Sequence, residues 1–162
     1  MIAGAGSCLK QMIDAYHERA EGGCMVAAFD VPENRVSAYG IINPDSDDGK
    51  VVKARGLVEK PTQAEAPSRV AVIGRYILTP EVLAALEKKK SGAGGEIQLT
   101  DAIAEQVTAP GGVVGYRFEG KRYDCGSKSG FLEATVAFAL EREDLRDEFY
   151  HYIKDVAKTL EA

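Results

Sequence analysis

The chain has 162 residues, of which 45% are hydrophobic and 28% are charged, a composition typical of a soluble globular protein. Its net charge of -5 argues against a nucleic-acid partner, because phosphate backbones are bound by basic surfaces. No apolar run approaches the length that crosses a bilayer and no signal segment opens the chain, so we expect no membrane partner. The sequence therefore predicts a single domain over residues 1–162.

Helices and strands alternate along the first half of the chain. Apolar residues recur at helical spacing over 8–19, which predicts a helix, and the continuous apolar run at 24–31 predicts a buried strand. Further strands are predicted at 36–42, 51–59 and 70–78, with a polar loop at 43–49 between the first two.

The second half continues the alternation. Helices are predicted at 80–90, 99–107, 127–140 and 144–160, with a strand at 113–118 and a hairpin turn at 119–121. Alternating strands and helices with one hairpin-like pair predict a mixed α/β architecture built on one sheet.

The three cysteines indicate the cellular compartment rather than a site. Cys8, Cys24 and Cys125 are odd in number and lack the spacing of metal ligands. They are typical of reduced thiols, so we expect a cytoplasmic protein.

The most informative local feature is Glu59 followed by Lys60 at the predicted end of a strand. Ligands of open α/β sheets bind at strand ends. There, a carboxylate can accept hydrogen bonds from sugar hydroxyls, and an ammonium can neutralise a phosphate. The alternative that the residues leave open is a solvated ion pair where the chain leaves the sheet.

Three other places have both a functional and a structural interpretation. Gly40, next to Tyr39, is a glycine inside a predicted strand, which marks the close approach of a ligand or of another backbone, or a bulge, and the pattern alone favours the bulge. The glycine-rich run 92–95 precedes a helix whose N-terminus could bind an anion, but a plain loop before a capped helix explains it better. Asp124 precedes Gly126 at a strand-to-helix junction, where it could help to hold Mg²⁺ or could cap the next helix.

Taken in order, these segments resemble bacterial UTP–glucose-1-phosphate uridylyltransferases, also called UDP-glucose pyrophosphorylases. The resemblance covers essentially the whole chain, and two runs are specific to this branch of the sugar nucleotidyltransferases: 92–102 and 118–126. The other matching segments are 7–12, 39–40, 57–61, 72–76 and 116–117.

The resemblance implies a Rossmann-like mixed β-sheet flanked by helices, of the nucleotide-diphospho-sugar transferase type. It also implies a reaction that joins glucose 1-phosphate to UTP, with Mg²⁺, to give UDP-glucose and pyrophosphate. In that reaction Lys60 is the catalytic residue and binds the sugar phosphate, while Glu59 contacts the glucose hydroxyls. The resemblance further implies a sugar pocket lined by Tyr39, Gly40 and Val72, and a metal-binding carboxylate at Asp124.

The sequence departs from the family pattern before Ser7. The family begins with a glycine-rich loop that wraps the nucleotide and has a metal-binding acidic pair further on, and neither is found among these residues. We therefore expect the C-terminal part of such an enzyme, without the N-terminal strands and inactive alone. An uncovered sheet edge recruits other strands, so we also expect a homo-oligomer.

Two alternatives remain open. The chain could be a non-catalytic module that kept a sugar-phosphate pocket. It could also come from a sugar nucleotidyltransferase of different base or sugar specificity, because the base is read mainly by the region that these residues do not include.

Overall fold

The computed structural model describes residues 2–3, 6–88 and 96–160. They form two compact units: the larger holds residues 8–119, and the smaller joins the first seven residues to residues 120–162. A single domain over residues 1–162 stays a prediction.

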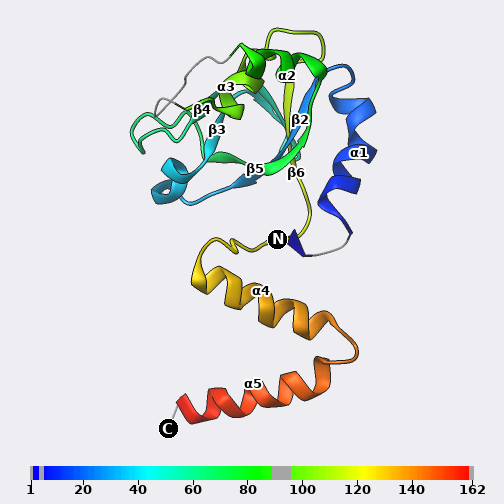
Figure 1. The fold of residues 1–162 in the computed structure, drawn as a ribbon, viewed down its shortest axis with the longest axis vertical. Helices are drawn as coiled ribbons and strands as arrows, with labels where there is room; N and C mark the ends of the chain where they lie inside the picture. The colour runs from blue at the N-terminus through cyan, green and yellow to red at the C-terminus, as the bar shows by residue number, and fades with distance from the viewer. Residues whose placement is uncertain (1, 4–5, 89–95, 161–162) are drawn as a thin grey trace. The chain divides into compact units, whose positions relative to one another are not determined.

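Five strands of the larger unit close into a barrel in the order β2-β5-β3-β4-β6 (Figure 1). β2 and β6 run parallel, whereas the other neighbouring pairs are antiparallel. The predicted mixed sheet is therefore confirmed. The strands are β2 (Cys24–Asp30), β3 (Gly40–Asp47), β4 (Val51–Glu59), β5 (Val70–Ile77) and β6 (Val113–Arg117).

Closure of the barrel removes the free sheet edge that the sequence led us to expect. Each of these five strands has a partner on both sides. One side of the ring is closed by antiparallel pairing of β4 with β6, in which Val51 lies opposite Tyr116. The other is closed by a single pair between β3 and β5, Ile41 with Ala71. The expectation of an unpaired edge is therefore wrong for the described strands of this unit.

The second strand lies further along the chain than predicted. Residues 33–38 form a 3₁₀ helix, η1 (Glu33–Ala38), and β3 runs from Gly40 through residues expected to be a polar loop. These residues extend β3 and β4 as a hairpin, where side chains 43–47 are partly or fully exposed. Exposure on this hairpin explains why an apolar pattern did not mark the strand. Asp48 closes its tip, because Oδ1 accepts the backbone N–H groups of Lys50 and Val51 at 2.9 and 2.6 Å.

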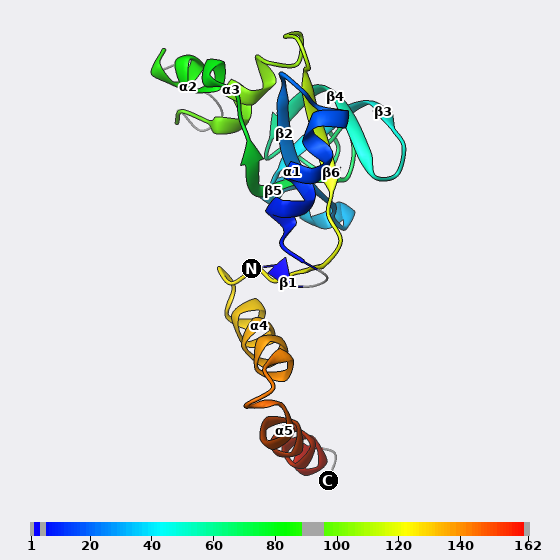
Figure 2. The same ribbon diagram turned by 90° about the vertical axis from the view of Figure 1, so that its right-hand side faces the viewer.

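Three helices cover the barrel. α1 (Cys8–Arg19) lies beside β2 and β5 with Met12 fully buried (Figures 1 and 2). α2 (Pro80–Glu87) and α3 (Leu99–Ala104) contact each other, and α3 also contacts β4. Buried side chains of both helices join the main core with residues of all five strands. α3 ends three residues before its predicted limit.

The smaller unit consists of a short ladder and two helices. β1 (Ile2–Ala3) pairs with β7 (Lys121–Arg122), and α4 (Lys128–Glu141) contacts α5 (Arg146–Leu160). Ser127 caps α4, since its Oγ accepts the N–H of Gly130 at 3.1 Å. The two predicted helices are confirmed in this unit. No helix of the described residues combines the length and the apolar character needed to cross a membrane.

All three cysteines are free thiols. Cys8 and Cys24 are buried, and Cys125 is half-buried. Burial raises the pKa of the Cys8 thiol, so this group stays protonated at neutral pH.

Candidate functional site

Lys60 occupies an unusual backbone conformation at the end of β4. Its φ is 45°, in the left-handed region, where it is the only residue other than glycine among those described. Its backbone N–H donates to the carbonyl oxygen of Tyr39 at 3.0 Å, which ties the end of β4 to the residue before β3. Residues with such strained backbone are common at functional sites, and they persist only where the surrounding structure holds them in place.

The side chains of Glu59 and Lys60 differ in how firmly they are held. The Glu59 side chain is 12% exposed, and its Oε2 accepts a hydrogen bond from the Thr100 hydroxyl at 2.5 Å. Its Oε1 lies 3.8 Å from the Nζ of Lys60, whose side chain is 58% exposed. The alternative of a solvated ion pair fits the exposed ammonium of Lys60, but it does not fit the largely covered carboxylate of Glu59. The result is a fixed carboxylate beside an ammonium that can reach a ligand from solvent.

Gly40 makes room for this carboxylate. It pairs with Glu59 in the β3–β4 register. A Cβ at position 40 would lie 2.9 Å from both Oε2 of Glu59 and Oγ1 of Thr100. The irregularities of this ladder lie instead between Asn43 and Ser46. The bulge interpretation is therefore wrong for Gly40, whose close neighbours are two side chains, and the close approach of a ligand stays a prediction.

Tyr39 and Val72 pack in different clusters. The half-buried Tyr39 packs against the small cluster of Val31, Val36, Ile41 and Ala71. Val72, the next residue after Ala71 on β5, is 8% exposed and belongs to the main core. The structure thus brings Gly40, Glu59 and Lys60 together, and the backbone carbonyl of Tyr39 accepts the Lys60 N–H. A sugar pocket that includes the Tyr39 and Val72 side chains stays a prediction.

Two residues of this region were not singled out from the sequence. Gln98 is the N-cap residue of α3, and the hydroxyl of Thr100, two residues further on, donates a hydrogen bond to Glu59. Thr100 and Glu59 lie 41 positions apart in the sequence, so no local pattern could indicate their contact. Tyr76 is half-buried on β5; burial raises its pKa, and the negative charge of Glu59 raises it further.

Asp124 belongs to the smaller unit and has protein partners of its own. Its Oδ1 accepts the N–H of Gly126 at 3.2 Å, and its Oδ2 lies 3.7 Å from a guanidinium nitrogen of Arg122. The helix cap is Ser127, so the alternative that Asp124 caps α4 is wrong. Within the described residues, no group of three or more histidine, cysteine or acidic side chains could hold a metal. Mg²⁺ is usually held by one or two carboxylates together with waters and substrate phosphates, so Asp124 as one ligand stays a prediction.

The glycine-rich run at 92–95, interpreted as a plain loop rather than an anion site, falls outside the described residues. The first helix after it, α3, has six residues and begins at Leu99.

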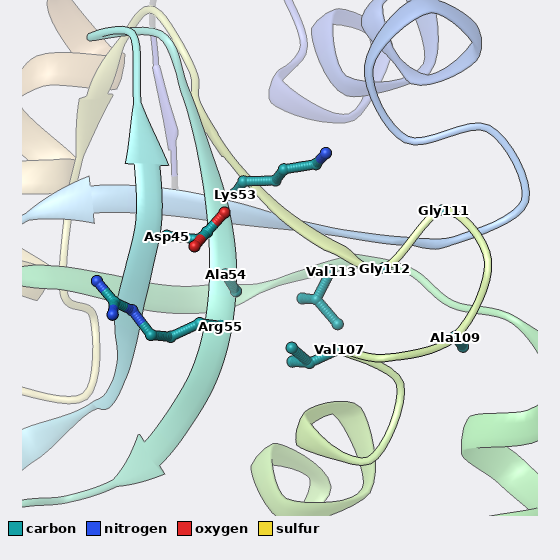
Figure 3. Close-up of a pocket in the computed structure, with 9 residues that line it drawn as sticks. All are labelled: Asp45, Lys53, Ala54, Arg55, Val107, Ala109, Gly111, Gly112 and Val113. Carbon is teal, nitrogen blue, oxygen red and sulfur yellow. The ribbon is translucent and has the colours of Figure 1, made fainter.

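A separate pocket of about 380 Å³ lies on another part of the larger unit (Figure 3). Figure 3 shows the side chains of Lys53 and Arg55, both on β4, extending away from each other, while Val107 and Val113 line its apolar side. The Arg55 Nε donates to the carbonyl oxygen of Pro44 at 2.8 Å, which turns this cation toward β3. None of the residues singled out from the sequence lines this pocket.

Known proteins similar to this chain agree with the resemblance drawn from its motifs. The profile of the nucleotidyl transferase family matches residues 4–141. The UTP–glucose-1-phosphate uridylyltransferase of Staphylococcus haemolyticus is 43% identical over 148 residues, which cover 91% of this chain and 50% of the relative. The Bacillus subtilis enzyme of the same name is 41% identical over 146 residues, covering 90% and 49%.

Solved structures give the same result. A UDP-glucose pyrophosphorylase complexed with UDP-glucose is 42% identical, with a TM-score of 0.77 over 87% of this chain and 53% of that one. A UTP-bound enzyme from Acinetobacter baumannii is 33% identical, with a TM-score of 0.79 over 94% and 52%. The α/β fold implied by the motifs is thereby confirmed. The chain spans about half the length of the curated relatives it matches.

Proposed function

The chain belongs to the nucleotidyl transferase family, and we propose that it provides the sugar-phosphate-binding part of a UTP–glucose-1-phosphate uridylyltransferase. Identity of 41–43% to relatives of that name over nine-tenths of the chain supports this assignment. The observation that carries it is the fixed carboxylate of Glu59 beside the exposed ammonium of Lys60.

The two side chains suit the two ends of glucose 1-phosphate. Lys60 is a point charge on a flexible stem and neutralises the phosphate. Glu59 accepts a hydrogen bond from a hexose hydroxyl through Oε1, the oxygen that Thr100 does not bind. Because Oε1 is also the oxygen nearer to the Lys60 Nζ, one ligand can contact both groups.

The reaction needs little covalent work from the protein. An oxygen of the sugar phosphate attacks the α-phosphorus of UTP, the new P–O bond forms, and the bond to pyrophosphate breaks. Rate then comes from alignment of two anionic substrates, and orientation alone lowers such barriers by roughly 7–11 kcal/mol. In this scheme Glu59 and Lys60 hold and orient the acceptor.

A divalent metal, Mg²⁺ by resemblance, would screen the phosphates in the complete reaction. The described residues hold no group of three acidic, histidine or cysteine side chains for it, and Asp124 as one ligand stays a proposal. A cytoplasmic location and a homo-oligomer also stay proposals. The homo-oligomer is no longer supported by a free strand edge, since the described barrel strands are paired on both sides.

The alternative of a binding module without catalysis makes a different prediction about the longer protein. The test replaces the matching segment of a full-length relative by residues 8–119 of this chain. Under our proposal, the resulting protein forms UDP-glucose from UTP and glucose 1-phosphate. A binding module in the same place supports binding of glucose 1-phosphate without turnover.

Isothermal titration tests the sugar-phosphate site directly. We expect the 162-residue protein to bind glucose 1-phosphate, Lys60→Ala to weaken binding of both glucose 1-phosphate and inorganic phosphate, and Glu59→Gln to weaken only the former. Lys88→Ala is a matched control, because Lys88 is an exposed lysine at the end of α2. Equal affinities of the protein and the Lys60→Ala variant would remove Lys60 from its role.

A further inference from the structure

We propose that Thr100 is a positioning residue, whose hydroxyl holds the Glu59 carboxylate in the orientation that reads the hexose. This inference rests on the proposed function and adds a residue to its site. The observation behind it is the 2.5 Å hydrogen bond from Thr100 Oγ1 to Glu59 Oε2. Hydrogen bonds from a hydroxyl to an ionised carboxylate are short and about twice as strong as neutral ones, which suits them to fix a side chain.

The core holds Thr100 in place. Ala102 and Ile103, on the next part of α3, are 5% and 1% exposed and belong to the main core. α3 also contacts β4, the strand that ends at Glu59. The hydroxyl therefore sits on a short helix whose position is set by buried side chains rather than by Glu59.

Glu59 has three rotatable side-chain bonds and needs such a partner. Gly40 lies against Glu59 Oε2 and Thr100 Oγ1, and because it has no side chain it leaves space for their contact. The bond from Thr100 occupies Oε2 and leaves Oε1 on the side of Lys60. A hexose hydroxyl then meets a carboxylate that is already oriented, which lowers the entropy lost on binding.

Thr100→Val keeps the shape of the side chain and removes its hydroxyl, so it tests this role with little change in packing. We expect its affinity for glucose 1-phosphate to fall about tenfold, close to the lower limit for loss of a hydrogen bond to a charged group. Affinity for inorganic phosphate, which reports on Lys60 alone, stays unchanged. Thr100→Ser restores hexose binding, while Thr108→Val, at an exposed position in the turn after α3, leaves both affinities unchanged.

A double-mutant cycle separates positioning from a general effect on the fold. If Thr100 acts through Glu59, Thr100→Val has no further effect on glucose 1-phosphate binding once Glu59→Ala is present. Urea unfolding of the same four proteins without ligand measures the contact itself and gives a non-zero coupling.

The outcomes distinguish this inference from the proposed function. Hexose-specific binding that Thr100→Val leaves intact, or weakens equally with and without Glu59, would overturn the positioning role alone. Zero coupling in the unfolding cycle would do the same. Failure of the unsubstituted protein to bind glucose 1-phosphate would overturn the proposed function and the positioning role with it, even if unfolding shows the contact.

Discussion

Gly40→Ala adds a single methyl group at the most crowded point of the candidate site. The new Cβ would lie 2.9 Å from both Glu59 Oε2 and Thr100 Oγ1, whereas ordinary contact begins at 3.4 Å. Each neighbour must therefore give way by about 0.5 Å, and overpacking of this kind costs about 1–3 kcal/mol. Glu59 moves more easily because the methyl group meets the far end of its flexible side chain. We expect a loss of about 1–2 kcal/mol in the free energy of unfolding, and about tenfold weaker binding of glucose 1-phosphate.

Gly56→Ala is the matched control on the neighbouring strand. Among the described residues, a Cβ there would meet only the Cβ of Asn43, at 3.9 Å, and neither glycine has a positive φ. Its replacement should therefore be neutral or stabilising by up to about 1 kcal/mol, through the unfolded chain. Urea denaturation and calorimetric titration of both variants give the comparison. Equal stability and equal affinity of the two variants would refute the crowded arrangement of Gly40, Glu59 and Thr100.

Three further predictions concern the backbone, the acid stability and the activity of the chain. Lys60→Gly should raise the free energy of unfolding by up to about 1 kcal/mol, because glycine adopts a positive φ without strain. In calorimetry the same variant should bind phosphate more weakly. Lys60→Ala should weaken phosphate binding in the same way but should not raise the free energy of unfolding. The hydrogen bond from Arg117 holds the pKa of Asp47 below its usual value, so the stabilising effect of this bond is present above the usual carboxyl pKa and is lost as the pH falls through the lowered pKa. Asp47→Asn should therefore be less stable at pH 7 and show a shallower loss of stability in acid denaturation; an unchanged acid limb would contradict this. Finally, a coupled assay should detect no UDP-glucose formation by the 162-residue polypeptide alone, and turnover would contradict that expectation.

Apolar patterning predicted most elements because most of them are buried on a clear face. β2 was found from a run of residues whose first five are fully buried, and β4 and β5 ended close to their predicted limits. β3 was misplaced because half of it lies in an exposed hairpin, where polar residues pair without an apolar face. Closure into a barrel depends on contacts such as Val51 with Tyr116, which are distant in sequence and have no local signal.

The candidate site was predictable only where its residues are neighbours in the chain. Glu59 and Lys60 stand together at a strand end, and Gly40 interrupts a strand pattern, so each carried a local signal. The register that places Gly40 opposite Glu59 and the hydrogen bond from Thr100 are tertiary features. Tyr76 lies in the matching segment 72–76 but was not singled out within it; burial and the negative charge of Glu59 raise its pKa.

The central claim is that Glu59 and Lys60 bind the two ends of a phosphorylated hexose. An experimental structure of the protein with glucose 1-phosphate tests it most directly. We predict a phosphate oxygen within hydrogen-bond distance of Lys60 Nζ and a hexose hydroxyl on Glu59 Oε1, with the Thr100 hydrogen bond intact. A ligand whose phosphate lies between Lys53 and Arg55, in the pocket of Figure 3, with Glu59 uncontacted, would contradict the account.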